Sequence, residues 1–138
     1  MEFPPFIANF GSEMKNQAFI WGATFALAAI AVGTFGAHII RDSISEVRHW
    51  EAYLTGARYH MYHALALLIV GILAHLKESK WLKIPMWFFI AGIFLFSGSL
   101  YALAITGIGK FGMITPLGGL SFMVAWSLII IHLSLIHI

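Results

Sequence analysis

The sequence predicts an all-α integral membrane protein that folds as a four-helix bundle. Four stretches contain no Asp, Glu, Lys or Arg: residues 16–40, 59–76, 84–109 and 111–138. A helix of about 20 apolar residues crosses a hydrocarbon layer about 30 Å thick, so each stretch is long enough to span a membrane. The chain is 60% hydrophobic and 10% charged, whereas soluble domains are roughly 25% charged.

The order of these stretches predicts one four-span domain, residues 17–138, behind an N-terminal interfacial lead-in of residues 1–16. We expect Pro4 and Pro5 to oppose regular structure in the lead-in. The first apolar run is too long for the core of a signal peptide, so we interpret it as a retained span. The expected spans are about 18–40, 57–76, 85–106 and 115–136.

The connection between the first two spans carries the pattern of a short amphipathic interfacial helix. Ser43 and Glu46 have the spacing of a capping box. Apolar residues then recur at helical spacing through Trp50 to Leu54, and Gly56 offers a stop. The alternative is a plain solvated linker.

Charge and composition limit the partners. The net charge of +2 comes from Lys and Arg beside the spans, where they meet lipid headgroups, so it does not indicate nucleic acid. The absence of cysteine excludes disulfides and thiolate chemistry. Basic residues are nearly balanced between the two sides, and the compact loop 77–83 favours cytoplasmic termini.

Small residues predict where the helices approach closely, because packing rather than hydrophobicity associates helices in lipid. We expect this packing inside the bundle, with self-association of the first span as the alternative. The predicted packing residues are Gly22, Ala26, Ala29, Gly33, Gly36, Gly92, Gly98, Gly118 and Gly119.

Connectivity places most of the polar intramembrane residues in one leaflet, because the ends of spans one and three and the starts of spans two and four share a membrane side. Polar groups at such depth are costly unless they face the bundle and find partners. The predicted cluster comprises His38, Arg58, Tyr59, His60, His63, Ser97, Ser99, Tyr101, Thr106 and Thr115.

Three interpretations of this cluster stay open. It is a hydrogen-bonded layer that fixes the helix register, a cavity for a small solute or protons, or a cofactor site. For the third, His38, His60 and His63 would supply three imidazoles to Zn²⁺, or His38 and His63 would ligate a haem. No metal or cofactor is predicted, since no intramembrane carboxylate orients the imidazoles. No nucleophile and base form a catalytic set, so we expect no enzyme.

Four motifs resemble a known family: GTFGAH at 33–38, ARYHMYHALALL at 57–68, FSGSLY at 96–101 and TPLGGL at 115–120. In this order they resemble the YgdD-like family of small bacterial inner-membrane proteins, domain-of-unknown-function family four-two-three, over about residues 17–130. The resemblance implies a multi-pass inner-membrane protein with four helices and no established reaction. The family usually has Gln at the position of His60, so the resemblance implies no metal or proton role there.

These observations favour a non-enzymatic accessory or scaffold component of a larger membrane assembly. Its expected partners are the lipid bilayer and other membrane proteins or further copies of itself. The first alternative is a small-solute or proton transporter that uses a one-sided polar cavity. The second is a haem- or metal-binding membrane subunit.

Overall fold

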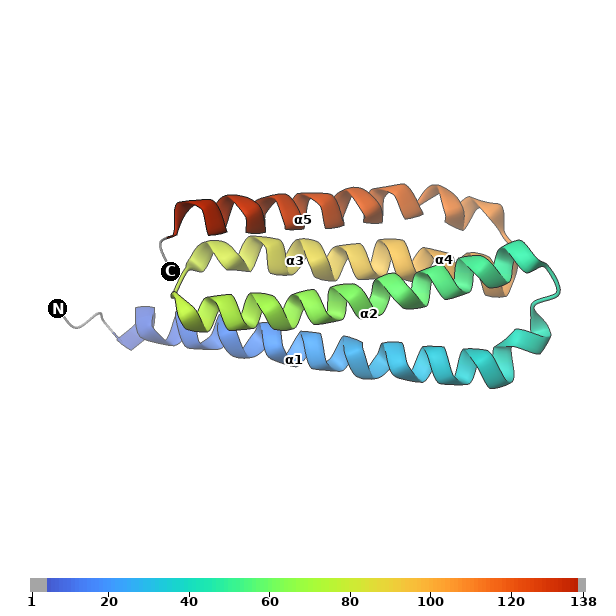
Figure 1. Ribbon diagram of the computed structural model, residues 1–138, viewed down its shortest axis with the longest axis horizontal. Coiled ribbons are helices and arrows are strands. Elements are labelled where there is room, and N and C mark those ends of the chain that lie inside the picture. The colour runs from blue at the N-terminus through green and yellow to red at the C-terminus, as the bar shows by residue number, and fades with distance from the viewer. Residues whose placement is uncertain (1–4, 137–138) are drawn as a thin grey trace.

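The structure, a computed structural model, describes the backbone of residues 5–136 and the side chains of residues 13–136 (Figure 1). Within these residues the chain forms four helical spans that are long and apolar enough to cross a membrane. The predicted four-helix membrane bundle is therefore confirmed.

The first two spans are long helices. Helix α1 runs from Pro5 to Phe35 and continues through a π-helical turn, η1 (Gly36–Ile40), and a 3₁₀ turn, η2 (Arg41–Ser43). Helix α2 runs from Val47 to Leu76.

The third span is one continuous helix with a π-helical segment in its middle. It is built from η3 (Lys80–Leu82), α3 (Lys83–Gly92), the π segment η4 (Ile93–Gly98) and α4 (Ser99–Thr106). After a turn at Gly107, which has a φ of 70°, a 3₁₀ turn η5 (Gly109–Met113) leads into α5 (Thr115–Leu135).

Figure 1 shows α1, α2, the third span and α5 side by side in that order, and contacts join each neighbouring pair. The core lies where α2, α3 and α5 meet, around fully buried Leu67, Val70, Met86 and Phe89. The third span therefore has a neighbour on two sides, α2 and α5. At the end opposite the termini, the α1–α2 connection extends farther than the α4–α5 connection (Figure 1).

The separate interfacial helix is a wrong prediction, because α2 is continuous from Val47 to Leu76. Gly56 does not stop a helix; it lets α4 approach, since a Cβ there would lie 3.0 Å from Cε1 of Tyr101. The capping box is also absent. The Ser43 hydroxyl donates to the carbonyl oxygen of Ile40 instead, and Glu46 makes no side-chain cap bond.

The expected irregular lead-in is likewise helical from residue 5 onward. Pro5 begins α1, in the first turn where its missing N–H costs nothing. Residues 1–4 of the lead-in lie outside the described residues.

An ion pair ties the start of α1 to the connection between α2 and the third span. The Lys15 ammonium donates to Oε1 of Glu78. This hydrogen bond, and then the positive charge itself, lower the pKa of Glu78 from its ordinary value of 4.5. Since the folded pKa is lowered, the pair stabilises the fold above that ordinary value, and the contribution is lost as pH falls through the lowered pKa.

Lys15→Gln should return the pKa of Glu78 to near 4.5, because the hydrogen bond and the Coulombic attraction both disappear. The measurement is an NMR titration of the side-chain carboxyl carbon in detergent micelles. Lys80→Gln, in the same connection, should leave this pKa unchanged. An equal effect of the two substitutions would refute the specific pair.

Candidate functional site: a polar layer between the helices

Nine of the ten predicted cluster residues lie in the half of their span that is nearer the α1–α2 and α4–α5 connections, and His63 lies near the middle of α2. Figure 1 shows this end of the bundle opposite the termini. They do not all meet. His60, His63, Ser97 and Ser99 are buried, and Tyr101 and Thr115 are half-buried. The exposed ones are His38, Arg58, Tyr59 and Thr106.

His63 is the most extensively bonded member. Its Nδ1 lies 2.8 Å from the carbonyl oxygen of Tyr59, and Nε1 of Trp126 donates to its Nε2 over 3.2 Å. The ring also stacks on Phe122 with centroids 3.4 Å apart. The carbonyl can only accept, so the proton sits on Nδ1, and the neutral imidazole satisfies both bonds. His63 thus joins α2 to α5.

His60 joins α2 to α4. A hydrogen bond of 3.1 Å links its Nδ1 to the hydroxyl of Tyr101. Its ring meets Phe25 of α1 edge-on, with centroids 5.7 Å apart. Its Nε2 is buried and has no hydrogen-bond partner, and the same holds for Oγ of Ser97.

Tyr53, which sequence reasoning missed, joins α2 to α1. Its side chain is 2% exposed and its hydroxyl donates to the carbonyl oxygen of Val32 over 2.8 Å. Gly36 makes this approach possible, because a Cβ there would lie 2.3 Å from Cε1 of Tyr53. Tyr53 precedes His60 by seven residues, two helical turns, and that periodicity is the signal that could have found it.

Hydroxyl groups join the third span to α5. Oγ of Ser99 donates to the carbonyl oxygen of Phe96 and lies 2.7 Å from Oγ1 of Thr115, whose hydroxyl therefore donates to it. Deeper in the bundle, Ser121 donates to the carbonyl oxygen of Phe88 over 2.7 Å. Ser121, Phe122 and Trp126 are further contributors that sequence reasoning did not place in the cluster.

The exposed members of the predicted cluster make local hydrogen bonds or none, and these bonds do not join helices. Thr106 donates to the carbonyl oxygen of Ala102 and accepts from the backbone N–H of Ile108, which closes the end of α4. Arg58 donates to Oγ1 of Thr55 over 3.3 Å on the outer surface. His38 is exposed on η1, apart from the buried imidazoles.

The structure therefore does not assemble the three imidazoles of the zinc alternative. Within the described residues, no three His, Asp or Glu side chains are placed to hold a metal ion together. The interhelical hydrogen bonds form a polar layer that connects the helices, and each of the four spans takes part in at least one of these bonds. The layer comprises Tyr53, His60, His63, Ser99, Tyr101, Thr115 and Trp126.

The predicted small residues divide into two groups. A Cβ on Gly22, Gly36, Gly92 or Gly118 would meet a neighbouring element at 2.3–2.7 Å, so these glycines allow close packing. Ala29 is buried and Ala26 half-buried. By contrast, a Cβ on Gly33 or Gly98 would meet nothing within 4 Å, and on Gly119 only the Phe96 ring at 3.8 Å.

Comparison with known proteins places these features in a family. Residues 32–119 match the family described as "Protein of unknown function (DUF423)". The chain belongs to this family. The DUF423 match includes Tyr53, His60, His63 and the Ser99–Thr115 pair, so it covers most of the polar layer.

Named relatives of this DUF423 protein are membrane proteins. It is 44% identical over 113 residues to the UPF0382 membrane protein YwdK of Bacillus subtilis, which covers 81% of this chain and 91% of the relative. It is 34% identical over 113 residues to the UPF0382 inner membrane protein YgdD of Escherichia coli, which covers 81% and 85%. No solved structure matches the chain. The protein is thus a multi-pass protein of the bacterial inner membrane.

Proposed function

We propose that this protein is a non-enzymatic accessory component that binds a transmembrane helix of another inner-membrane protein in a groove between α1 and α2. The α1–α2 groove has a volume of about 400 Å³ and lies on the outer surface of the bundle. Its lining residues are Ala29, Gly33, Leu54, Ala57, Arg58, Met61 and Tyr62.

The observation that carries the proposal is the open side of Gly33. A Cβ at this position meets nothing within 4 Å, so the glycine is not needed for packing inside the bundle. Beside it, Ala29 and Ala57 line the groove with small side chains. Small residues on a lipid-facing surface let the backbone of a second helix approach closely, which is how helices associate in membranes.

The degree of burial supports the same surface. In an apolar 18-residue stretch of each span, 22% of the residues are buried in span one, against 28% in span four and 50% in α2. Span one therefore presents most of its surface to whatever surrounds the bundle. The polar layer, by contrast, uses its imidazoles and hydroxyls mainly to hold the four spans together.

Arg58 favours a different protein over a second copy as the occupant. Its guanidinium carries five N–H donors, and the bond to Thr55 uses one of them. The nearest preceding carboxylate in the chain, Glu51, lies seven residues away, about 10 Å along the helix toward the headgroups. No Asp or Glu follows until Glu78. A helix with an acidic or amide side chain at the depth of Arg58 would complement the groove.

Gly33→Leu should abolish the complex, because the leucine fills the groove without touching the bundle. A photo-reactive amino acid at Met61 should form a discrete adduct with one membrane protein in intact cells. This adduct should disappear with Gly33→Leu and weaken with Arg58→Gln. The matched control is Gly98→Leu, which also adds a side chain in open space but lies on the third span.

Several outcomes would contradict the proposal. These are adducts with lipid alone, an adduct between two copies of this chain, or equal loss of the adduct with Gly98→Leu. The same adduct from a photo-reactive residue at Met123, exposed on α5, would also contradict it.

One observation favours the transport alternative: the unpartnered Nε2 of His60 and Oγ of Ser97 are polar atoms buried at the level of the layer. Proteoliposomes that hold the wild-type protein and a pH-sensitive dye decide between the two functions. The accessory function predicts no proton flux above that of empty liposomes. Flux that His60→Gln abolishes would support the alternative.

A further inference from the structure

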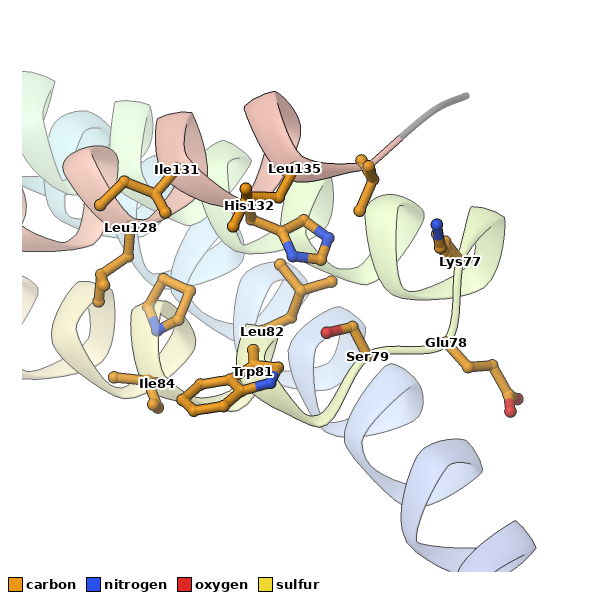
Figure 2. Close-up of a pocket in the computed structure, with 12 residues that line it drawn as sticks. Lys77, Glu78, Ser79, Trp81, Leu82, Ile84, Leu128, Ile131, His132 and Leu135 are labelled. Atoms are coloured by element: carbon orange, nitrogen blue, oxygen red, sulfur yellow. The ribbon is translucent and has the colours of Figure 1, made fainter. Parts of the chain in front are cut away.

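A second hollow lies at the opposite end of the bundle, where the last turns of α5 face the connection between α2 and the third span (Figure 2). We name it the end pocket, and its volume is about 450 Å³. Leu128, Ile131 and Leu135 of α5 line one side, and Trp81 and Ile84 line the other. Most of its lining is therefore aliphatic or aromatic.

The end pocket lies at the boundary between hydrocarbon and headgroups. Lys77, Glu78 and Ser79 form its outer rim, immediately after the last turn of α2. Trp81 is 67% exposed there, and tryptophan favours the headgroup level of a bilayer. An occupant of this pocket thus meets water and headgroups at the rim and hydrocarbon at Leu128, about 6 Å deeper than His132.

One polar atom that lines the end pocket has no hydrogen-bond partner within the protein. His132 projects into the pocket from α5 (Figure 2), and its Nε2 is buried without a hydrogen-bond partner. A buried polar atom without a partner is costly. An ester or phosphate oxygen that accepts from this imidazole, or a hydroxyl that donates to it, would remove that cost.

The positive charge of the rim favours a negatively charged occupant. The rim carries one cation, Lys77, and one carboxylate, Glu78. Glu78 is already paired with Lys15, so the rim presents net positive charge. Basic side chains at a membrane surface attract anionic lipids, by about 1 kcal/mol or about fivefold in affinity for each lysine.

We propose that the end pocket binds an anionic phospholipid from the surrounding leaflet. One acyl chain lies against Ile84, Leu128 and Ile131, the glycerol and ester region bonds to His132, and the phosphate lies beside Lys77. This site is independent of the α1–α2 groove, which lies toward the other end of the bundle.

Native mass spectrometry of the purified full-length protein tests the site. The delipidated protein is titrated with dioleoyl-phosphatidylglycerol or with dioleoyl-phosphatidylcholine at equal concentration. We expect one retained phosphatidylglycerol, with an affinity at least about fivefold above that of phosphatidylcholine. Lys77→Gln should lower the phosphatidylglycerol affinity about fivefold and leave phosphatidylcholine unchanged.

Ile131→Trp should fill the end pocket and abolish retention of the lipid. Ile130→Trp is the matched control, because Ile130 is the adjacent residue, is 67% exposed and does not line the pocket. Thermal unfolding in detergent without lipid checks that both variants fold, and Lys77→Gln gives the decisive result if Ile131→Trp does not.

Equal affinity for the two lipids, or full retention in Ile131→Trp that folds normally, would overturn the proposal. Displacement of the lipid by millimolar inorganic phosphate would also overturn it, because the site would then recognise phosphate alone.

Discussion

Gly118→Ala should destabilise the protein by about 1–3 kcal/mol, the cost typical of overpacking. Gly118 lies on α5 where this helix crosses η4. An added Cβ would lie 2.3 Å from the backbone nitrogen of Phe96 and 2.7 Å from its Cα. Backbone atoms cannot move aside by a rotamer change, so α5 and the third span must separate along their whole contact.

Gly119→Ala is the matched control because it is the next residue of the same helix. Its Cβ would meet only the Phe96 ring, at an ordinary 3.8 Å. Alanine is a better helix former than glycine, so this variant should be more stable by about 0.5–1 kcal/mol. Steric trapping, or unfolding in sodium dodecyl sulfate followed by tryptophan fluorescence, measures both free energies. Equal values for the two variants would disprove the close approach of α5 to η4.

His63→Ala should cost about 3 kcal/mol, within the range for removing a large side chain from a packed interior. The substitution removes the stacking on Phe122 at 3.4 Å, the bond to the Tyr59 carbonyl and the acceptor for Trp126. It also leaves a cavity where α2, α3 and α5 meet, since His63 further contacts the Phe89 ring.

Trp126→Phe separates hydrogen bonding from packing at the same place. It keeps an aromatic ring beside Phe89 and removes the N–H that donates to His63. The smaller ring costs little packing, because Trp126 is exposed. Interhelical hydrogen bonds in membranes contribute about 0.6 kcal/mol on average and at most about 1.7. The free energy of unfolding in mixed micelles should therefore fall much less than in His63→Ala. Similar losses would show that the hydrogen bond, and not the stacked ring, is the main contribution of His63.

The four spans, and the end of the bundle toward which most of the polar residues lie, could be predicted from the sequence. Runs without charge reveal the spans because lipid tolerates few exceptions, and alternating direction then decides which helix ends are neighbours. The prediction went wrong where a local signal met tertiary packing. A glycine such as Gly56 is typical of a helix end, but Tyr101 of α4 packs on it, and α2 continues through it.

Which cluster members face inward could not be derived from the sequence alone. Ser97 and Ser99 are two residues apart, nearly opposite on a helix, yet both are buried. This is possible because the third span has α2 on one side and α5 on the other, an arrangement that hydropathy does not reveal. His38 falls within the π-helical turn η1, where the regular helical periodicity that would place it does not apply.

The unequal lengths of α2 and α5 have a consequence for the surrounding lipid. Helix α2 has 30 residues and is about 45 Å long, whereas α5 has 21 residues and is about 32 Å long. A bilayer whose hydrocarbon is about 30 Å thick matches α5 and falls short of α2. One rim of the molecule is therefore stepped, and headgroups beside the α4–α5 turn rest against the flank of α2. We therefore expect the molecule to tilt by different amounts in bilayers of different thickness.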